Sequence, residues 1–104
     1  MHARVATFTY TGDALDLARQ AENGLLPIFR GQPGFNGYSL IDTGDTIISI
    51  TAWDSPEAAE RANVISSEWI EANIEDQVEL RKAQIGELML STPLGVSTKA
   101  HAAV

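Results

Sequence analysis

The side chains that could do chemistry in this sequence are aromatic rings, amides and one late arginine. Trp69 lies on the apolar stripe of an expected helix, and Asn63 and Asn73 flank that stripe. Tyr38 and Arg81 fall in expected strands. A flat aromatic ligand can stack on the rings, while a neighbouring amide or guanidinium polarises its oxygen atom. Core packing explains the same rings and solvation explains the same amides, so both interpretations stay open.

Other catalytic chemistries find little support. His2 and His101 lie near the two ends of the chain, so we expect solvated residues there and neither a metal site nor a serine–histidine–aspartate set. The sequence has no cysteine, which excludes disulfides, zinc thiolates and thiol nucleophiles. The glycines of "GQPGFNG" precede no helix that could bind a phosphate, and no GxGxxG or P-loop motif occurs. The sequence therefore predicts no cofactor, neither a flavin nor a nicotinamide.

Composition restricts the partners further. The 104 residues suit one domain, and 44% hydrophobic with 20% charged residues is typical of a folded globular chain. A formal net charge of -7 with no basic run disfavours nucleic acid and an anionic membrane surface. No stretch approaches the roughly 20 apolar residues of a membrane span, and the start "MHARVATF" does not resemble a signal peptide. We expect a cytoplasmic protein with no nucleic-acid or membrane partner.

Two stretches have helical periodicity. Small and aliphatic residues recur at spacings of three and four between positions 14 and 29, after Asp13 or Thr11 as the capping residue. Pro27 lies inside this stretch, and because proline removes a helix hydrogen bond we expect a kink or a second short helical segment there. The second helix is expected to begin at Ser55, with Pro56 in the first helical position. Its glutamates are expected to form a solvated outer face: Glu60, Glu68, Glu71, Glu75 and, beyond the helix, Glu79.

Four stretches have the character of strands: residues 4–10, 35–42, 46–53 and 80–90. Gly44 can adopt the positive φ of a hairpin between the middle two. Isoleucines occupy both faces of the third strand, which indicates burial on both sides. The order strand, helix, strand, strand, helix, strand predicts a ferredoxin-like α+β sandwich, an antiparallel sheet with two helices on one face. We expect its other face to pack against a second copy, giving a homodimer.

The domain is expected to span residues 1–91. The remaining residues, 92–104, read "TPLGVSTKAHAAV" and are small, polar or alanine-rich. We expect a flexible tail or an arm that contacts the other protomer of the dimer.

Three segments carry a resemblance to a known family. "LLPIFRGQPGFNGYSLIDTGD", "SITAWDSPEAAERA" and a late "GEL" resemble the antibiotic-biosynthesis-monooxygenase-like (ABM-like) family of dimeric α+β barrel proteins, over about residues 3 to 90. The resemblance implies two ferredoxin-like protomers whose sheets pack into one barrel. It also implies cofactor-free oxygenation of phenolic, quinol or polyketide-type aromatics by O2. Many members of the family have no known reaction.

One branch of that family degrades haem, and this chain resembles it at Trp69. That branch has a ligand histidine nine or ten residues further on, where this chain has Val78 and Glu79. It also has an asparagine in the first strand, where this chain has "ATF" at positions 6–8. Because haem iron needs its axial ligand, haem degradation is not expected.

Two functions from different classes follow. The first is a cofactor-independent monooxygenase-like protein that acts with O2 on a small aromatic molecule. The second is a non-catalytic dimeric module of the same fold, which binds a small ligand or has a stress-related role. For the first we predict these substrate-binding residues: Trp69, Asn63, Asn73, Tyr38 and Arg81.

Overall fold

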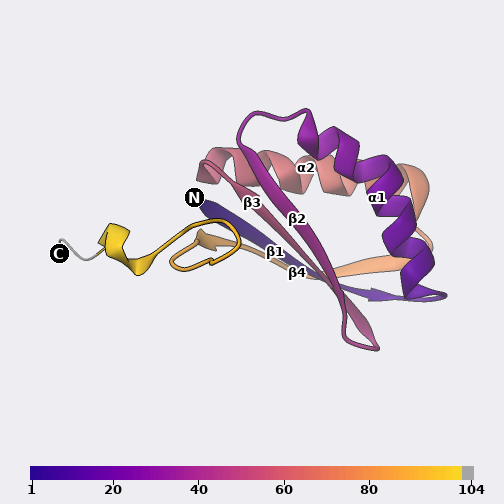
Figure 1. The fold of residues 1–104 in the computed structure, drawn as a ribbon. Helices are drawn as coiled ribbons and strands as arrows, with labels where there is room; N and C mark the ends of the chain where they lie inside the picture. The colour runs from indigo at the N-terminus through magenta and orange to yellow at the C-terminus, as the bar shows by residue number, and fades with distance from the viewer. Residues whose placement is uncertain (102–104) are drawn as a thin grey trace.

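The structure is a computed structural model that describes residues 1–101 (Figure 1). Its elements follow the order expected from the sequence, ending in a short 3-10 helix: β1 (His2–Tyr10), α1 (Ala14–Arg30), β2 (Phe35–Asp42), β3 (Thr46–Trp53), α2 (Pro56–Asn73), β4 (Val78–Glu87) and η1 (Thr98–His101). The βαββαβ order confirms the predicted ferredoxin-like α+β class.

The four strands form one antiparallel sheet in the order β2-β3-β1-β4. Both helices lie on the same face of this sheet (Figure 1). Along β1 the buried positions alternate, so Arg4, Ala6 and Phe8 face the helices while Val5 and Thr7 face the other way. The sheet therefore has a helix-covered face and an open face.

Local sequence signals set the helix starts. The Asp13 carboxylate accepts a hydrogen bond from the backbone N–H of Leu15 at 3.0 Å, as a capping residue does. The Ser55 hydroxyl accepts one from the N–H of Ala58 at 3.2 Å, with Pro56 in the first turn. Both predicted caps are confirmed.

The expected second segment at Pro27 is wrong, because α1 continues as one helix to Arg30. Leu25 and Phe29 lie on either side of Pro27 and are both buried in the core. A proline inside a helix costs about 3 kcal/mol, and burying two large side chains fully contributes about that much or more. Packing therefore outweighs the local cost.

Trp69 lies where the two helices meet the sheet. It packs against an aromatic cluster around Phe29 and Trp53 at one end of the core and against Leu17 and Ile74 at the other. A Cβ atom at Gly24 of α1 would lie only 2.7 Å from the Trp69 Nε1 atom. Glycine at this position therefore allows α1 to approach the indole ring.

The β2–β3 hairpin turns at Gly44, which has a φ of 104° as predicted. The β2–β3 register shifts between Phe35 and Gly37, as at a β-bulge. This shift sets the phase of β2 so that Tyr38 faces the helices, opposite Thr51 of β3.

The last strand is displaced from the predicted range of 80–90. β4 begins at Val78 and ends at Glu87, which pairs with His2 at the start of β1. One further hydrogen bond joins the Leu88 N–H to the Met1 carbonyl at 2.9 Å. Beyond it, Ser91 and Val96 pair as an isolated bridge, and the loop between them brings the Leu94 side chain within 3.8 Å of where a Cβ atom at Gly37 would lie. The short helix η1 then extends away from the sheet (Figure 1). Residues 102–104 lie outside the described part, so the role of 92–104 stays a prediction.

The open face of the sheet is apolar at its centre. Ile48 and Ile50 of β3 lie there beside Val5 of β1, and Ile41 of β2 is 45% exposed. Ile47 points to the opposite, helix-covered face and is buried, which confirms that β3 is apolar on both sides. Homodimer formation through the open face stays a prediction.

None of the helices within residues 1–101 is long and apolar enough to cross a membrane.

Candidate functional site

Two neighbouring cavities lie between the helices and the sheet. The smaller, of about 40 Å³, is apolar, and its walls include Tyr38 and Trp69. The larger, of about 480 Å³, has a polar side formed by Arg4 and Asn63. The two cavities share four lining residues: Phe8, Ser66, Ile70 and Val78. The volume of the larger cavity suits a small organic molecule.

Arg4 is a buried cation. Its side chain is only 2% exposed, because position 4 falls on the helix-covered face of β1. Its Nε–H donates a hydrogen bond to the Asn63 Oδ1 atom, and its Nη1 atom has no hydrogen-bond partner within the described residues. Burial lowers the pKa of Arg4, an effect that Tyr38 opposes only in part. The guanidinium therefore has unused hydrogen-bonding capacity at the cavity wall.

Asn63 is oriented by this contact. Since its Oδ1 atom accepts from Arg4, its amide nitrogen must face elsewhere, and the nearest acceptor is a Glu60 carboxylate oxygen at 3.5 Å. A separation of that length is a weak hydrogen bond. The amide N–H groups therefore stay available to a ligand in the larger cavity.

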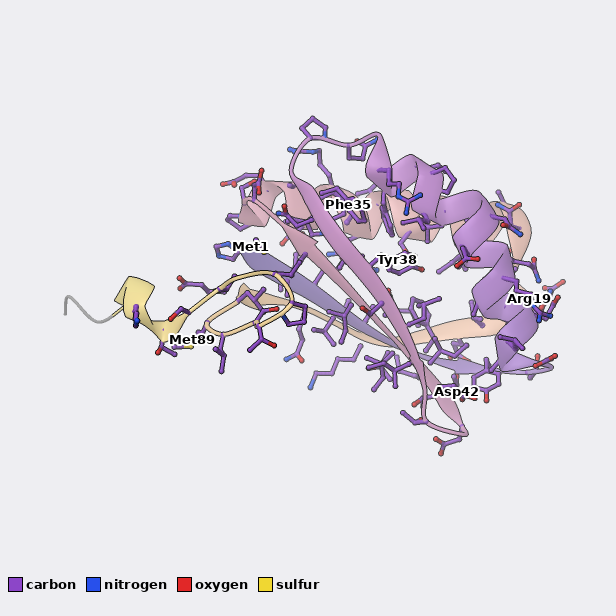
Figure 2. All side chains as sticks on the ribbon, in the orientation of Figure 1. Met1, Arg19, Phe35, Tyr38, Asp42 and Met89 are labelled. Carbon is purple, nitrogen blue, oxygen red and sulfur yellow. The ribbon has the colours of Figure 1, made fainter. Side chains whose placement is uncertain are left out.

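Tyr38 lies on the helix-facing side of β2 (Figure 2). Burial raises the pKa of its phenol to about 12, although a hydrogen bond with Ser49 and the charge of Arg4 lower it in part. The group is therefore a neutral hydroxyl at physiological pH, and it lies within electrostatic range of Arg4. It can donate a hydrogen bond but cannot act as a base there.

The raised pKa of Tyr38 predicts an alkaline loss of stability. Since the folded-state pKa lies above the unfolded value of about 10, the stabilisation is complete below pH 10 and disappears as the pH rises to about 12. The free energy of unfolding lost over this pH range is of the order of 2–3 kcal/mol.

Denaturant unfolding of the wild type and of Tyr38→Phe, measured from pH 8 upwards, checks this loss of stability. The variant should be less stable near pH 8 by about 1 kcal/mol, for the lost hydrogen bond, and lose this deficit as the pH rises. Parallel stability curves for the two proteins would rule the effect out.

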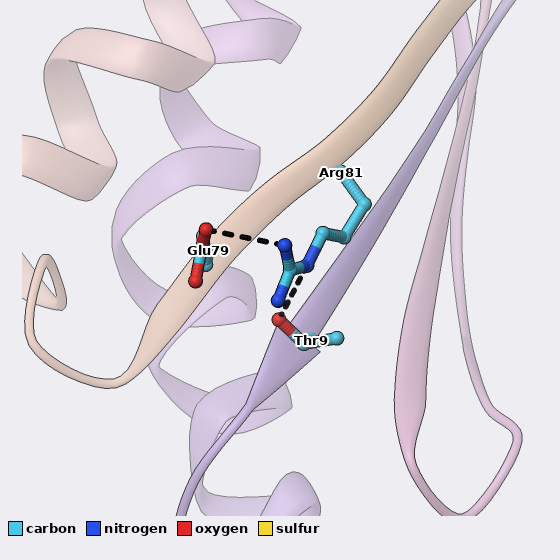
Figure 3. A network of polar contacts seen from close by, with 3 residues as sticks. All are labelled: Thr9, Glu79 and Arg81. Atoms are coloured by element: carbon cyan, nitrogen blue, oxygen red, sulfur yellow. Dashed lines mark hydrogen bonds and ion pairs between the residues drawn. The ribbon is translucent and has the colours of Figure 1, made fainter.

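Asn73 and Arg81 lie apart from these cavities and are not among the residues that line them. The Asn73 amide donates to the Trp69 carbonyl at 2.8 Å, at the end of α2. Arg81 of β4 donates to the Thr9 hydroxyl at 3.2 Å and pairs with Glu79 at 3.3 Å (Figure 3). Thr9 alternates with the core-facing Phe8, so this network belongs to the open face. The structure thus brings together Tyr38, Trp69 and Asn63 only.

His2 differs from expectation. It is partly buried at the start of β1, and its Nδ1 atom is buried with no hydrogen-bond partner among residues 1–101. The His101 side chain lies outside the described part of the structure. Within that part, no group of three or more histidine, aspartate or glutamate side chains is arranged to hold a metal ion.

The sequence had not marked Arg4 as a site residue. A signal was available, because side chains two positions apart in a strand point to the same face of the sheet. Arg4 therefore lies on the same core face as Ala6 and Phe8, where a charged residue is unusual. Glu71 and Glu75 were expected to form part of a solvated outer face. They are exposed, yet they also line the larger cavity.

Comparison with known proteins supports the fold. No protein-family model matches the sequence, and no curated protein matches it. Among solved structures, the chain is similar to SnoaB, a cofactor-independent oxygenase from Streptomyces nogalater, with a TM-score of 0.67 and 19% identity over 88% of this chain and 96% of SnoaB. It is also similar to a protein of unknown function from Nitrosomonas europaea, NE2512, with a TM-score of 0.66 and 18% identity over 88% and 91% of the two chains.

A further similarity is to a monooxygenase from the gene ActVA-Orf6 of Streptomyces coelicolor, whose structure contains the ligand nanaomycin D. Its TM-score is 0.61 and its identity 25%, over 86% of this chain and 92% of that one. These neighbours include cofactor-independent and antibiotic-biosynthesis monooxygenases, and they confirm the resemblance predicted from the sequence. The chain resembles antibiotic-biosynthesis-monooxygenase-like proteins and has their ferredoxin-like fold.

Proposed function

We propose that this protein is a cofactor-independent monooxygenase that uses O2 on a phenolic, quinol or polyketide-type aromatic. The observation that carries the proposal is the hydrogen bond between the buried Arg4 and the half-buried Asn63, at the wall of a cavity whose apolar lining includes Phe8 and Ile70. A monooxygenase-like fold and a pocket of suitable size support it. The proposal places the aromatic ring in the larger cavity, against Phe8 and Ile70 on the side next to the smaller cavity that Trp69 lines, and its oxygen atom near Asn63.

In this reaction the substrate supplies every electron. In an anthrone, a ring CH2 group and O2 give a carbonyl group and water; in a naphthoquinol, the quinol and O2 give a hydroxyquinone and water. In both reactions one oxygen atom of O2 enters the product and the other leaves as water. The chain must stabilise the substrate anion that reacts with O2. The Arg4 charge and the Asn63 amide act at that negative charge, beside the apolar side chains of Phe8 and Ile70. Tyr38 donates its neutral hydroxyl and removes no proton.

The working unit is proposed to be a homodimer. An open face with Ile48, Ile50 and Val5 at its centre would be shielded by a second copy of the same face. A stable interface typically buries about 800 Å² per partner. The helix-covered cavities lie on the opposite side of the sheet from this interface.

Oxygen consumption tests the proposed reaction. Chelator-treated protein is mixed with a panel of anthrones and naphthoquinols, and O2 uptake is followed with an electrode. We expect uptake above the rate of heat-denatured protein, and Asn63→Leu should lower kcat about 100-fold because it removes one donor to the anion. Uptake equal to the blank across the panel would contradict the proposal. A ligand-dependent rise in Tm without uptake would favour the non-catalytic binding module.

A further inference from the structure

The larger cavity has opposite charges at its two ends. Arg4 and Asn63 line one end, and Glu71 and Glu75 line the other. Along α2, Glu71 follows Asn63 by eight residues, which is about 12 Å at 1.5 Å per residue. The remaining lining is apolar or small and includes Phe8, Ile70 and Leu80. The cavity is therefore an apolar slot with a cationic end and an anionic end.

The cationic end lacks a counter-ion. Arginine is almost never fully buried unless it is paired, yet Arg4 is 2% exposed and its one hydrogen-bond partner is a neutral amide. Its Nη1 atom has no partner within residues 1–101. The electrostatic neighbour that affects its pKa is Tyr38, which is a neutral phenol at physiological pH. A negative group on a ligand would complete this site.

A carboxylate suits these donors better than a single oxygen atom. A guanidinium presents paired N–H groups that match the two oxygens of a carboxylate. The Asn63 amide nitrogen, which makes only a weak hydrogen bond to Glu60, adds a further donor at the same end. A bare inorganic anion would satisfy Arg4 but would leave most of a cavity of about 480 Å³ unfilled. The rest of the volume calls for a ring system attached to the anion.

We infer that the cavity selects an aromatic carboxylate. The carboxylate pairs with Arg4, the rings fill the apolar middle, and the Asn63 amide stays beside the ring oxygen that becomes the anion. Other hydroxyl groups of the ligand point towards Glu71 and Glu75, which can accept hydrogen bonds from them. This inference takes one point from the proposed function, namely that the ligand contains an aromatic ring system. To that function it adds that the substrate is negatively charged and that its carboxylate lies at the Arg4 end of the cavity.

Calorimetric titration in the absence of turnover tests this inference. The probes are a hydroxynaphthoic acid, the matching hydroxynaphthamide and inorganic phosphate. We expect wild-type protein to bind the acid at least about tenfold more tightly than the amide, because one charge-assisted hydrogen bond contributes that much. Arg4→Met should bind the two equally, and Arg4→Lys should retain part of the preference. Arg61→Met, which removes an exposed arginine of α2, should behave as wild type.

The outcomes separate the two proposals. Equal affinity for acid and amide in the wild type, or a preference that survives in Arg4→Met, overturns the carboxylate inference and leaves the proposed function standing. Phosphate binding as tightly as the acid also overturns it, since the site would then be a simple anion site. Failure of both naphthalene compounds to bind contradicts the ring-binding cavity itself, and with it both proposals.

Discussion

Arg4→Met is expected to make the ligand-free protein more stable, by about 1–3 kcal/mol. The wild-type side chain buries a charge with one neutral partner and one unpaired nitrogen. Replacing a buried charged group with an apolar one of similar size often stabilises a protein by 1–4 kcal/mol. Part of that gain is lost because the Asn63 oxygen loses its donor, which costs about 1 kcal/mol. Thermal unfolding should show a Tm several degrees higher, since each kcal/mol shifts Tm by roughly 4–8 °C in a domain of this size.

Arg61→Met is the matched control for this result. It makes the same chemical change and the same change in net charge at an exposed position of α2. Surface substitutions of this kind usually alter stability by less than about 0.5 kcal/mol. A gain at Arg4 alone would mean that the protein retains a destabilising residue because its ligand needs it. If Arg4→Met instead lowers Tm, Arg4 is a structural residue and the site argument fails.

Ile50→Glu is expected to convert a dimer into monomers. Ile50 lies at the centre of the open face, between Val5 of β1 and Ser39 of β2. In a dimer formed through this face, each copy would bury an unpaired carboxylate, which costs several kcal/mol. Sedimentation of the wild type at micromolar concentration should give twice the 11.2 kDa mass of one chain, and the variant should give the single-chain mass. The dissociation constant should rise at least about 100-fold, which corresponds to about 2.7 kcal/mol.

Val64→Glu provides the control for the dimer. Val64 is 57% exposed on α2, on the helix side of the sheet, so the same type of substitution there adds the same charge away from the open face. It should sediment as the wild type does. A wild-type protein that sediments at 11.2 kDa, or an Ile50→Glu variant that remains dimeric, would contradict an interface through this face.

The elements could be predicted because their signals are local. The caps at Asp13 and Ser55 and the hairpin at Gly44 depend on a few adjacent residues, and the structure has all three. The order of strands and helices along the chain then predicted the α+β class. Two local predictions needed correction because distant contacts decide them. Core packing carries α1 through Pro27 without a second helical segment, and pairing with β1 sets β4 to Val78–Glu87 in place of the predicted 80–90.

The site was harder to predict because it depends on contacts between distant residues. Asn63, Trp69 and Tyr38 could be proposed from their types alone, and they do lie around neighbouring cavities. The partner of Asn63 is Arg4, which lies 59 positions away in the chain and contacts it only through the packing of α2 on β1. Arg81 has the same side chain as Arg4, but its contact with Thr9 belongs to the open face. The two arginines therefore differ in the face of the sheet on which their side chains lie, which their residue type does not reveal.

The most direct test of the central claim follows the fate of isotopically labelled O2. Metal-free protein is incubated with labelled O2 and with the anthrone or naphthoquinol that gives the fastest uptake, and the product is analysed by mass spectrometry. The proposed reaction predicts one labelled oxygen atom in each product molecule, formed at a rate that Asn63→Leu greatly reduces. A product without label, or labelling at the same rate in the variant, would contradict an oxygenase site at Asn63.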